Sequence, residues 1–265
     1  MRQPKRLGAL LPFDSGENAI NTNARILKIS KQISDRYPFT INSDQTEIHF
    51  TLNQNTMNSK RHRLELFMKY AAALDLINAF TSDWLNELFP GISRIVGCTQ
   101  GVENHSEGDV AIHTAMVFEN LLQVCRCDLG READFIERLA AIIHDWKKPD
   151  SRIEDENGSI AFPGHEELAN SELSMVGNTL ELNALELSKL RFLVAEHGNS
   201  HGFENLSPEK QISLRGDANI ESLCAFQKAD AMSCHCIDGG HLPVKWNLIF
   251  PDCTLRQNIT DQSTI

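Results

Sequence analysis

Four polar residues occupy positions that the sequence otherwise gives to apolar side chains. His113 lies at helical spacing among valines, His144 and Asp145 end an apolar run, and Asp230 follows Phe226 by four residues. A carboxylate buried without a partner costs several kcal/mol, so an inward Asp requires a cation, a metal ion or a hydrogen-bond network. Each residue alone is more often a satisfied core or cap residue than a ligand. Two imidazoles and two carboxylates from three helices can nevertheless converge on one point, and this set suits a divalent first-row metal or Mg²⁺.

The three helices that must carry these residues are predicted by the apolar spacing of the sequence. An apolar period of 3.6 recurs along most of the chain after residue 60. We expect helices at about residues 110–126, 131–147, 165–177, 184–197 and 219–234. An apolar stripe that includes Leu64, Leu74 and Leu76 precedes them, and a second short helix is expected before Pro90.

Signals for β-strands are confined to the N-terminal part of the chain. Residues 39–41 and 48–52 alternate with period two around a polar turn, which predicts a small hairpin. Residues 151–163 are expected to form a polar loop. The expected fold class is therefore mainly α, with the N-terminal β-hairpin as its only sheet.

Composition and charge exclude several classes of function. The chain has 265 residues, 41% of them hydrophobic, and no apolar run long enough to span a membrane. Residues 1–70 carry 11 Lys/Arg and 6 Asp/Glu, whereas residues 71–265 carry 14 and 30. An acidic body repels a phosphodiester backbone, which argues against broad nucleic-acid binding, although the basic N-terminal part could hold RNA.

The cysteines and the start of the chain bear on its location. The first apolar stretch is short and contains a proline, so we expect no signal peptide and a cytoplasmic protein. Seven cysteines, an odd number, are typical of reduced thiols. The pairs Cys125/Cys127 and Cys234/Cys236 have a one-residue spacing, whereas structural zinc sites commonly space their ligands by two to four residues.

Five segments, in this order, resemble one known family. They are residues 103–114 (ENHSEGDVAIHT), 141–149 (AIIHDWKKP), 162–166 (FPGHE), 193–197 (LVAEH) and 228–231 (KADA). Their pattern resembles the HD-domain metal-dependent phosphohydrolases, and it is closest to the HD domain of bacterial CCA-adding tRNA nucleotidyltransferases. The resemblance covers roughly residues 92–235. It implies an HD-type helical bundle at residues 92–238. The N-terminal region (1–91) and the C-terminal tail (239–265) have no counterpart in this resemblance, and we expect the hairpin and helices of residues 1–91 to pack on the bundle.

The resemblance makes four residues the ligands of a divalent metal ion: His113, His144, Asp145 and Asp230. The ion is one of Mn, Ni, Co, Fe or Mg, and the sequence does not choose among them. In the implied reaction, the metal lowers the pKa of a bound water and polarises a phosphoryl oxygen. Asp145 could also orient or deprotonate the attacking water, because one carboxylate oxygen can remain free.

Four further residues match positions around this centre. His165 and His197 match residues that bind a second metal or the substrate phosphate; each could instead be a helix-terminal histidine bonded to a backbone carbonyl. Lys148 matches a lysine that compensates phosphate charge, and His105 matches a loop histidine near the entrance. The implied activity is hydrolysis of a phosphomonoester or phosphodiester, with a nucleotide as the expected substrate.

Two departures from the family pattern affect this interpretation. Lys147 stands where the family commonly has glycine, which makes the rim more basic. Residues 1–91 contain no Gly-Ser turn followed by Asp-x-Asp, which the nucleotidyltransferase catalytic domain requires. The resemblance therefore carries over the hydrolase module and not the tRNA-polymerising activity.

Two alternative functions remain open from the sequence. Residues 198–202 (GNSHG) fit the G-x-S-x-G pattern of serine hydrolases, but that motif needs a preceding strand, and residues 188–197 indicate a helix. A bundle of this type could also be a non-catalytic metal- or nucleotide-binding sensor or an RNA-associated module. All four metal-ligand positions are filled, which favours catalysis. The substrate and the oligomeric state cannot be read from the sequence.

Overall fold

The computed structural model describes residues 39–41, 50–52, 59–101, 103–200 and 203–234. The chain divides into two compact units, Met1–Ser59 and Lys60–Ile265. In the first unit, β1 (Phe39–Ile41) and β2 (Phe50–Leu52) pair antiparallel, which confirms the predicted hairpin. The described part of the second unit is mainly helical, so the expected fold class is also confirmed.

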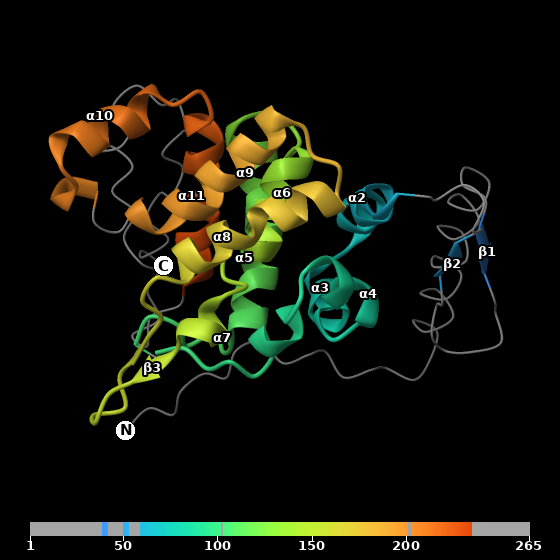
Figure 1. Ribbon diagram of the computed structural model, residues 1–265, viewed down its shortest axis with the longest axis horizontal. Helices are drawn as coiled ribbons and strands as arrows, with labels where there is room; N and C mark the ends of the chain where they lie inside the picture. The colour runs from blue at the N-terminus through green and yellow to red at the C-terminus, as the bar shows by residue number, and fades with distance from the viewer. Residues whose placement is uncertain (1–38, 42–49, 53–58, 102, 201–202, 235–265) are drawn as a thin grey trace, which may run out of the picture. The chain divides into compact units, whose positions relative to one another are not determined.

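The described part of the second unit is a helical assembly (Figure 1). Its described α-helices are α2 (Lys60–Tyr70), α3 (Ala73–Phe80), α4 (Asp83–Leu88), α5 (Val110–Asp128), α6 (Phe135–Ile143), α7 (Lys148–Ser151), α8 (His165–Thr179), α9 (Ala184–Glu196), α10 (Pro208–Gly216) and α11 (Ile220–Ser233). It also contains the 3₁₀ helices η1 (Ile92–Ile95), η2 (His197–Ser200) and η3 (Phe203–Asn205), and the strands β3 (Ile153–Glu154) and β4 (Ile160–Ala161).

Helix α5, green in Figure 1, runs through the middle of this unit and packs against α3, α6 and α11. It begins where the Asp109 side chain accepts a hydrogen bond from the Ile112 backbone N–H at 2.9 Å, which satisfies a donor left free at a helix start. Val117 and Leu121 on its inner face are buried, and the burial of these apolar side chains holds the helix against its neighbours. The buried His113 lies on the same helix.

Helix α6 is shorter than the predicted segment 131–147. It begins at Phe135, because Asp134 and Glu137 form a reciprocal capping box around its first turn. It ends at Ile143, with His144 as the C-terminal cap and a turn closed by the hydrogen bond from Lys148 N to the Asp145 carbonyl at 3.0 Å. Residues 144–147 therefore form a bend between α6 and α7 instead of the last turn of a long helix.

The bend is anchored by Trp146, which is buried directly after Asp145. Its indole N–H donates to the Pro90 carbonyl at 3.1 Å, and its ring packs edge-on against Phe89 with the centroids 6.0 Å apart. A large aromatic side chain that packs through its ring and also donates a hydrogen bond through its N–H has little rotational freedom. The backbone of the bend is thus held against η1 and the end of α4.

Three other predictions were wrong in detail. The stripe from Leu64 to Leu76 is split between α2 and α3, and Leu74 is 68% exposed. The N-terminal hairpin is not the only sheet, because β3 and β4 pair across a turn in which the Asp155 side chain accepts from two backbone N–H groups. Helix α10 was not predicted, since Leu214 is its only buried residue and it therefore shows almost no apolar periodicity.

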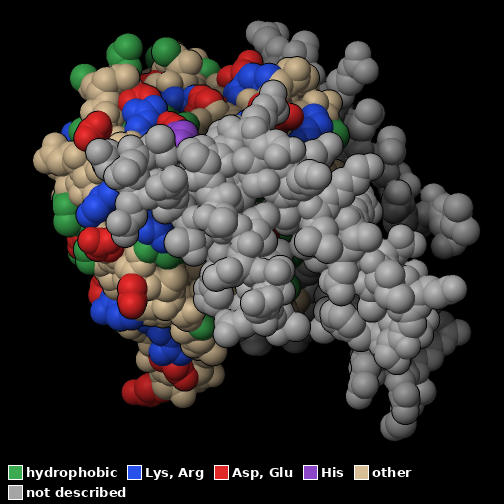
Figure 2. Space-filling model, turned by 90° about the vertical axis from the view of Figure 1, so that its right-hand side faces the viewer, with side chains coloured by type: hydrophobic (Ala, Val, Ile, Leu, Met, Phe, Trp, Pro, Cys, Tyr) green, Lys and Arg blue, Asp and Glu red, His purple; other side chains and the backbone are tan. Residues whose placement is uncertain are grey.

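Other features of the described residues concern the surface. None of the described helices has the length and apolar character needed to cross a membrane. Acidic and basic side chains alternate over the described part of the face in Figure 2, so neither charge dominates there. Most of the basic N-terminal part, the tail with Trp246, Leu248 and Phe250, and Cys236 lie outside the described residues.

Candidate metal centre

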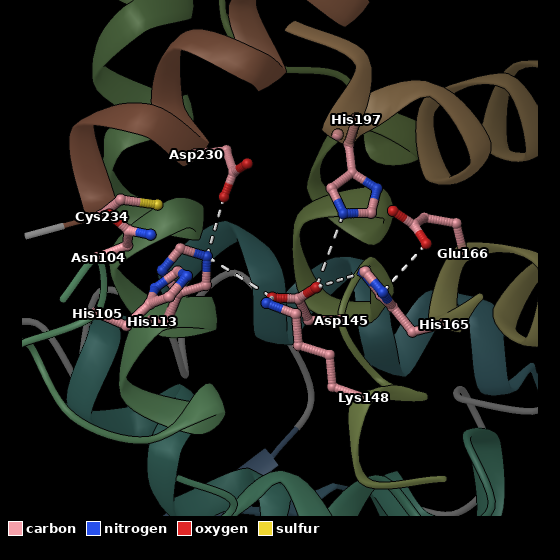
Figure 3. Close-up of a pocket in the computed structure, with 11 residues that line it drawn as sticks. Asn104, His105, His113, Asp145, Lys148, His165, Glu166, His197, Asp230 and Cys234 are labelled. Carbon is pink, nitrogen blue, oxygen red and sulfur yellow. Dashed lines mark hydrogen bonds and ion pairs between the residues drawn. The ribbon is translucent and has the colours of Figure 1, made fainter. Parts of the chain in front are cut away.

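A single pocket gathers nearly all the residues that the sequence singled out (Figure 3). The cavity has a volume of about 520 Å³. Its walls contain the predicted residues His105, His113, Asp145, Lys148, His165, His197 and Asp230, together with Asn104, Glu166, Gly198 and Cys234. His144, the remaining predicted residue, lies behind the wall with its ring centroid 5.0 Å from that of His197.

The pocket residues come from the ends of several helices. Asp145 lies in the bend after α6, and His165 is the first residue of α8. His197 caps the C-terminal end of α9, while His113 lies in the second turn of α5. Asp230 comes from the last turns of α11, the helix that packs along α5. The packing of these helices is therefore what brings residues far apart in the sequence to one place.

The carboxylate of Asp145 is the centre of the arrangement and is 1% exposed. Its Oδ2 atom lies 3.1 Å from His144 Nε2 and 3.7 Å from His113 Nε2. Its Oδ1 atom lies 3.2 Å from His165 Nε2 and 3.7 Å from His197 Nε2. In Figure 3, Asp145 accordingly lies between His113 on one side and His165 and His197 on the other. Four imidazole nitrogens thus surround one carboxylate, two at each oxygen.

Two more charged groups complete the centre. Asp230 Oδ1 lies 2.9 Å from His113 Nε2. Lys148 brings its ammonium group 2.8 Å from Asp145 Oδ2 and donates a hydrogen bond of 2.8 Å to Gln100 Oε1. Both Lys148 and Gln100 are buried, so this cation is held inside the protein between a carboxylate and an amide.

Three of the four histidine rings are oriented by the backbone. The Nδ1 atoms of His144, His165 and His197 lie 3.1, 2.8 and 2.8 Å from the carbonyl three residues earlier. A carbonyl only accepts hydrogen bonds, so the proton of each neutral ring is held on Nδ1 and the lone pair of Nε2 faces Asp145. His165 and His197 are therefore bonded to a backbone carbonyl, as the alternative prediction for these two residues expected. Each also directs its Nε2 atom into the pocket.

The electrostatics of the centre keep the carboxylate and the lysine charged. Burial by itself would raise the pKa of Asp145, but the neighbouring His144 and Lys148 hold it well below its ordinary value. Burial would likewise lower the pKa of Lys148, but Asp145 keeps it above its ordinary value. Burial lowers the pKa of His144, which therefore remains neutral near pH 7. For His113, burial also lowers the pKa, but hydrogen bonds to Asp230 and Glu107 raise it to about 9.

The buried polar atoms of this centre fit a metal ion. His144 Nε2, His165 Nε2 and both oxygens of Asp145 lie at ion-pair distances but make no well-directed hydrogen bond. Unsatisfied buried acceptors are costly, and a divalent cation would satisfy several of them at once. Ligand atoms within 4.8 Å of one another form four overlapping groups among the described residues: His105/His113/Cys234, His113/His144/Asp230, His144/Asp145/His197 and His165/Glu166/His197. Buried histidine and aspartate groups of this kind can bind a metal ion.

The sequence analysis gave no site role to the supporting residues Gln100 and Glu107 or to Asn104, Glu166 and Gly198 in the pocket wall, and it considered Cys234 only as a partner of Cys236. Gln100 and Glu107 lie in the loop before α5, where no periodicity indicates which way a side chain points. Cys234 follows Asp230 by one helical turn and lies in the pocket wall, where burial raises the pKa of its thiol. The serine of the GNSHG segment ends η2 directly after helix α9, so the strand that the serine hydrolase motif needs is absent from the described chain at this point.

Comparison with known proteins gives a partial similarity. The chain is 31% identical over 164 residues to a multifunctional CCA protein of Polaromonas naphthalenivorans (strain CJ2). The match takes in 60% of this chain and 35% of that protein, so the chain matches about a third of the relative's length. No protein-family model matches the chain. No solved structure matches it either. The resemblance to CCA-adding enzymes is therefore supported in part, while the HD domain is not matched by a family model.

Proposed function

We propose that this chain is a divalent-metal-dependent phosphohydrolase that cleaves a phosphomonoester or phosphodiester bond of a nucleotide. The observation that carries the proposal is the set of four imidazole nitrogens around the buried Asp145 carboxylate, with Asp230 and the Lys148 ammonium beside them. The order of the five matching motifs, which resemble HD-domain phosphohydrolases, supports the same reaction class. We assign the activity to the module at residues 92–238.

Two observations favour a small nucleotide as the substrate. The cavity of about 520 Å³ falls within the range of sites for small ligands. The relative is named a multifunctional CCA protein, and the motifs resemble those of enzymes that act on nucleotides. Lys148 supplies a buried positive charge at the pocket, as a phosphate group requires.

Under this proposal, His113, His144, Asp145 and Asp230 hold the metal ion. A bound divalent ion supplies a water of lowered pKa and polarises a phosphoryl oxygen. His165 and His197, at the other oxygen of Asp145, hold either a second ion or the substrate phosphate. This two-sided use of Asp145 follows from its contacts, because each oxygen faces a different pair of histidines.

The remaining groups act on the substrate. The ammonium of Lys148 neutralises charge on the phosphoryl oxygens, and its raised pKa keeps it protonated at neutral pH. A carboxylate oxygen of Asp145 that is not taken by the metal orients or deprotonates the attacking water. His105, in the pocket wall, meets the substrate near the entrance.

The test begins with metal analysis of the purified protein. Hydrolysis of bis(p-nitrophenyl) phosphate, p-nitrophenyl phosphate and a panel of nucleotides then follows with added Mn²⁺, Ni²⁺, Co²⁺ or Mg²⁺. Asp145→Asn is expected to abolish hydrolysis. Asp150→Asn is a matched control, because Asp150 is a nearby aspartate that pairs with Arg94 and Lys147 outside the pocket.

The outcomes separate an enzyme from a binding module. Metal-stimulated hydrolysis that depends on Asp145 and not on Asp150 supports the proposal. A wild-type protein that binds metal but hydrolyses none of these compounds is a non-catalytic sensor. A protein that binds no divalent metal overturns the proposal altogether.

A further inference from the structure

One carboxylate outside the proposed ligand set contacts two of the pocket histidines. Glu107 lies in the loop before α5, and its side chain is 2% exposed. Its Oε1 atom lies 2.7 Å from His105 Nδ1 and 3.2 Å from His113 Nδ1. The two rings stand edge to face with their centroids 5.0 Å apart. A single buried oxygen therefore lies between two imidazoles.

His113 differs from the other three histidines around Asp145 in what holds its ring. Those three lie at helix ends and have a backbone carbonyl at Nδ1, to which His165 adds the Glu166 carboxylate at 3.1 Å. His113 lies inside the first turns of α5, where the carbonyls are engaged in the helix, and its Nδ1 faces the carboxylate of Glu107 instead. Its orientation thus depends on a side chain that a substitution can remove.

The loop backbone holds Glu107 in this place. Asp109, two residues later, caps α5 through Ile112 N, accepts from Gly97 N at 2.5 Å and pairs with Thr99 in an isolated β-bridge. Gly108 between them has a φ of 138°, a conformation that residues with a Cβ rarely adopt. This turn lets Asp109 face the helix end while Glu107 faces the histidines.

We infer that Glu107 is a positioning residue for the metal centre, one that orients the ligand His113 and the entrance histidine His105 through their Nδ1 atoms. The inference rests on the proposed function, because it takes His113 as a metal ligand. A carboxylate at Nδ1 keeps a proton on that nitrogen, so Nε2, beside Asp145 and Asp230, is the atom left to bind a metal ion once it gives up its own proton. Loss of such an outer partner typically weakens metal binding by about 10–100-fold.

The experiment compares Co²⁺ binding to the metal-free wild type, Glu107→Gln and Glu119→Gln. Glu119→Gln is the matched control, since it makes the same change on α5 at a carboxylate that accepts a hydrogen bond from Ala73 N at 2.8 Å and does not line the pocket. We expect the Kd for Co²⁺ to rise about 10–100-fold in Glu107→Gln, with an altered visible spectrum of the bound ion. Glu119→Gln is expected to leave the Kd within about twofold of wild type. Circular dichroism checks that each variant is folded, and Glu107→Asp replaces Glu107→Gln if the latter is not.

A second measurement does not depend on metal. In ¹⁵N-detected spectra of the metal-free wild type, Nδ1–H signals of His105 and His113 are expected to be protected from exchange, and to lose this protection in Glu107→Gln. Equal Co²⁺ affinity and unchanged imidazole signals in the variant refute the role of Glu107 while leaving the proposed function intact. A wild type that binds no Co²⁺ contradicts the proposed function, and the imidazole signals then still decide whether Glu107 holds the two rings.

Discussion

The strongest stability prediction concerns Glu137, a fully buried carboxylate on the helix that leads into His144 and Asp145. Its two oxygens accept hydrogen bonds from the Arg131 guanidinium at 2.7 and 2.8 Å. Burial alone would raise the pKa of Glu137, but the hydrogen bonds from Arg131 and Ser222, with Lys189 nearby, lower it from 4.5 to about 2. The folded state therefore stabilises the charged form strongly.

The magnitude follows from this shift. One pKa unit corresponds to about 1.4 kcal/mol, so the charge of Glu137 contributes about 3 kcal/mol to the free energy of unfolding near pH 7. Because the folded pKa lies below the unfolded value, the contribution is complete above about pH 4.5 and is lost as the pH falls toward about 2. We expect Glu137→Gln to lower the free energy of unfolding by about 3 kcal/mol at neutral pH, and by about 1 kcal/mol less at about pH 3.5.

Urea unfolding followed by circular dichroism at several pH values measures this difference. Glu221→Gln is the control, because Glu221 Oε1 lies 3.3 Å from the same Arg131 guanidinium but its side chain is 60% exposed. An exposed pair of this kind contributes less than about 1 kcal/mol. If Glu137→Gln and Glu221→Gln cost the same, or if the cost of Glu137→Gln does not change with pH, the reasoning from burial and pKa is wrong.

Three further predictions concern the centre itself. Lys148→Ala is expected to lower kcat for phosphate ester hydrolysis by about 100-fold or more. Lys147→Ala is expected to leave kcat nearly unchanged, because it removes a cation that is paired with an acidic residue outside the pocket. Steady-state kinetics measure both values, and equal losses would contradict a special role for Lys148. Burial lowers the pKa of His113, but two carboxylates raise it to about 9, so metal binding near pH 7 should release about one proton. Calorimetry in buffers of different ionisation enthalpy measures this release, and a binding heat that is independent of buffer would speak against it. Gly108→Ala should destabilise the fold by about 1–3 kcal/mol, because φ is 138° and the new Cβ would lie 2.9 Å from Ile112 Cδ1; thermal unfolding at wild-type level would show that the loop relaxes freely.

Much of the centre could be predicted from the sequence because its residues interrupt apolar patterns. His113 and Asp230 stand on helical stripes, and the apolar run before His144 and Asp145 marks where that pair enters the core. The periodicity of a helix is local, so these positions can be read without knowing the fold. The structure brings these residues, with Lys148, into one cluster around a pocket.

The end of α6 could not be predicted in the same way. The apolar spacing predicted a helix that continues to residue 147. The chain instead bends after Ile143, because Trp146 packs on Phe89 and donates a hydrogen bond to the Pro90 carbonyl. These contacts join segments far apart in the sequence. Only this bend turns Asp145 so that its two oxygens face different pairs of histidines.

The sequence by itself determined the mainly helical class and the residue types of the candidate metal centre, because both follow from local spacing and from the cost of burying charge. Tertiary structure alone decided how these residues are used. Helix packing decides which oxygen of Asp145 lies near which histidine. The loop backbone angles decide that Gln100 contacts Lys148 and that Glu107 contacts two imidazoles. Loop side chains have no periodic register, so their directions become defined only when the surrounding helices are in place.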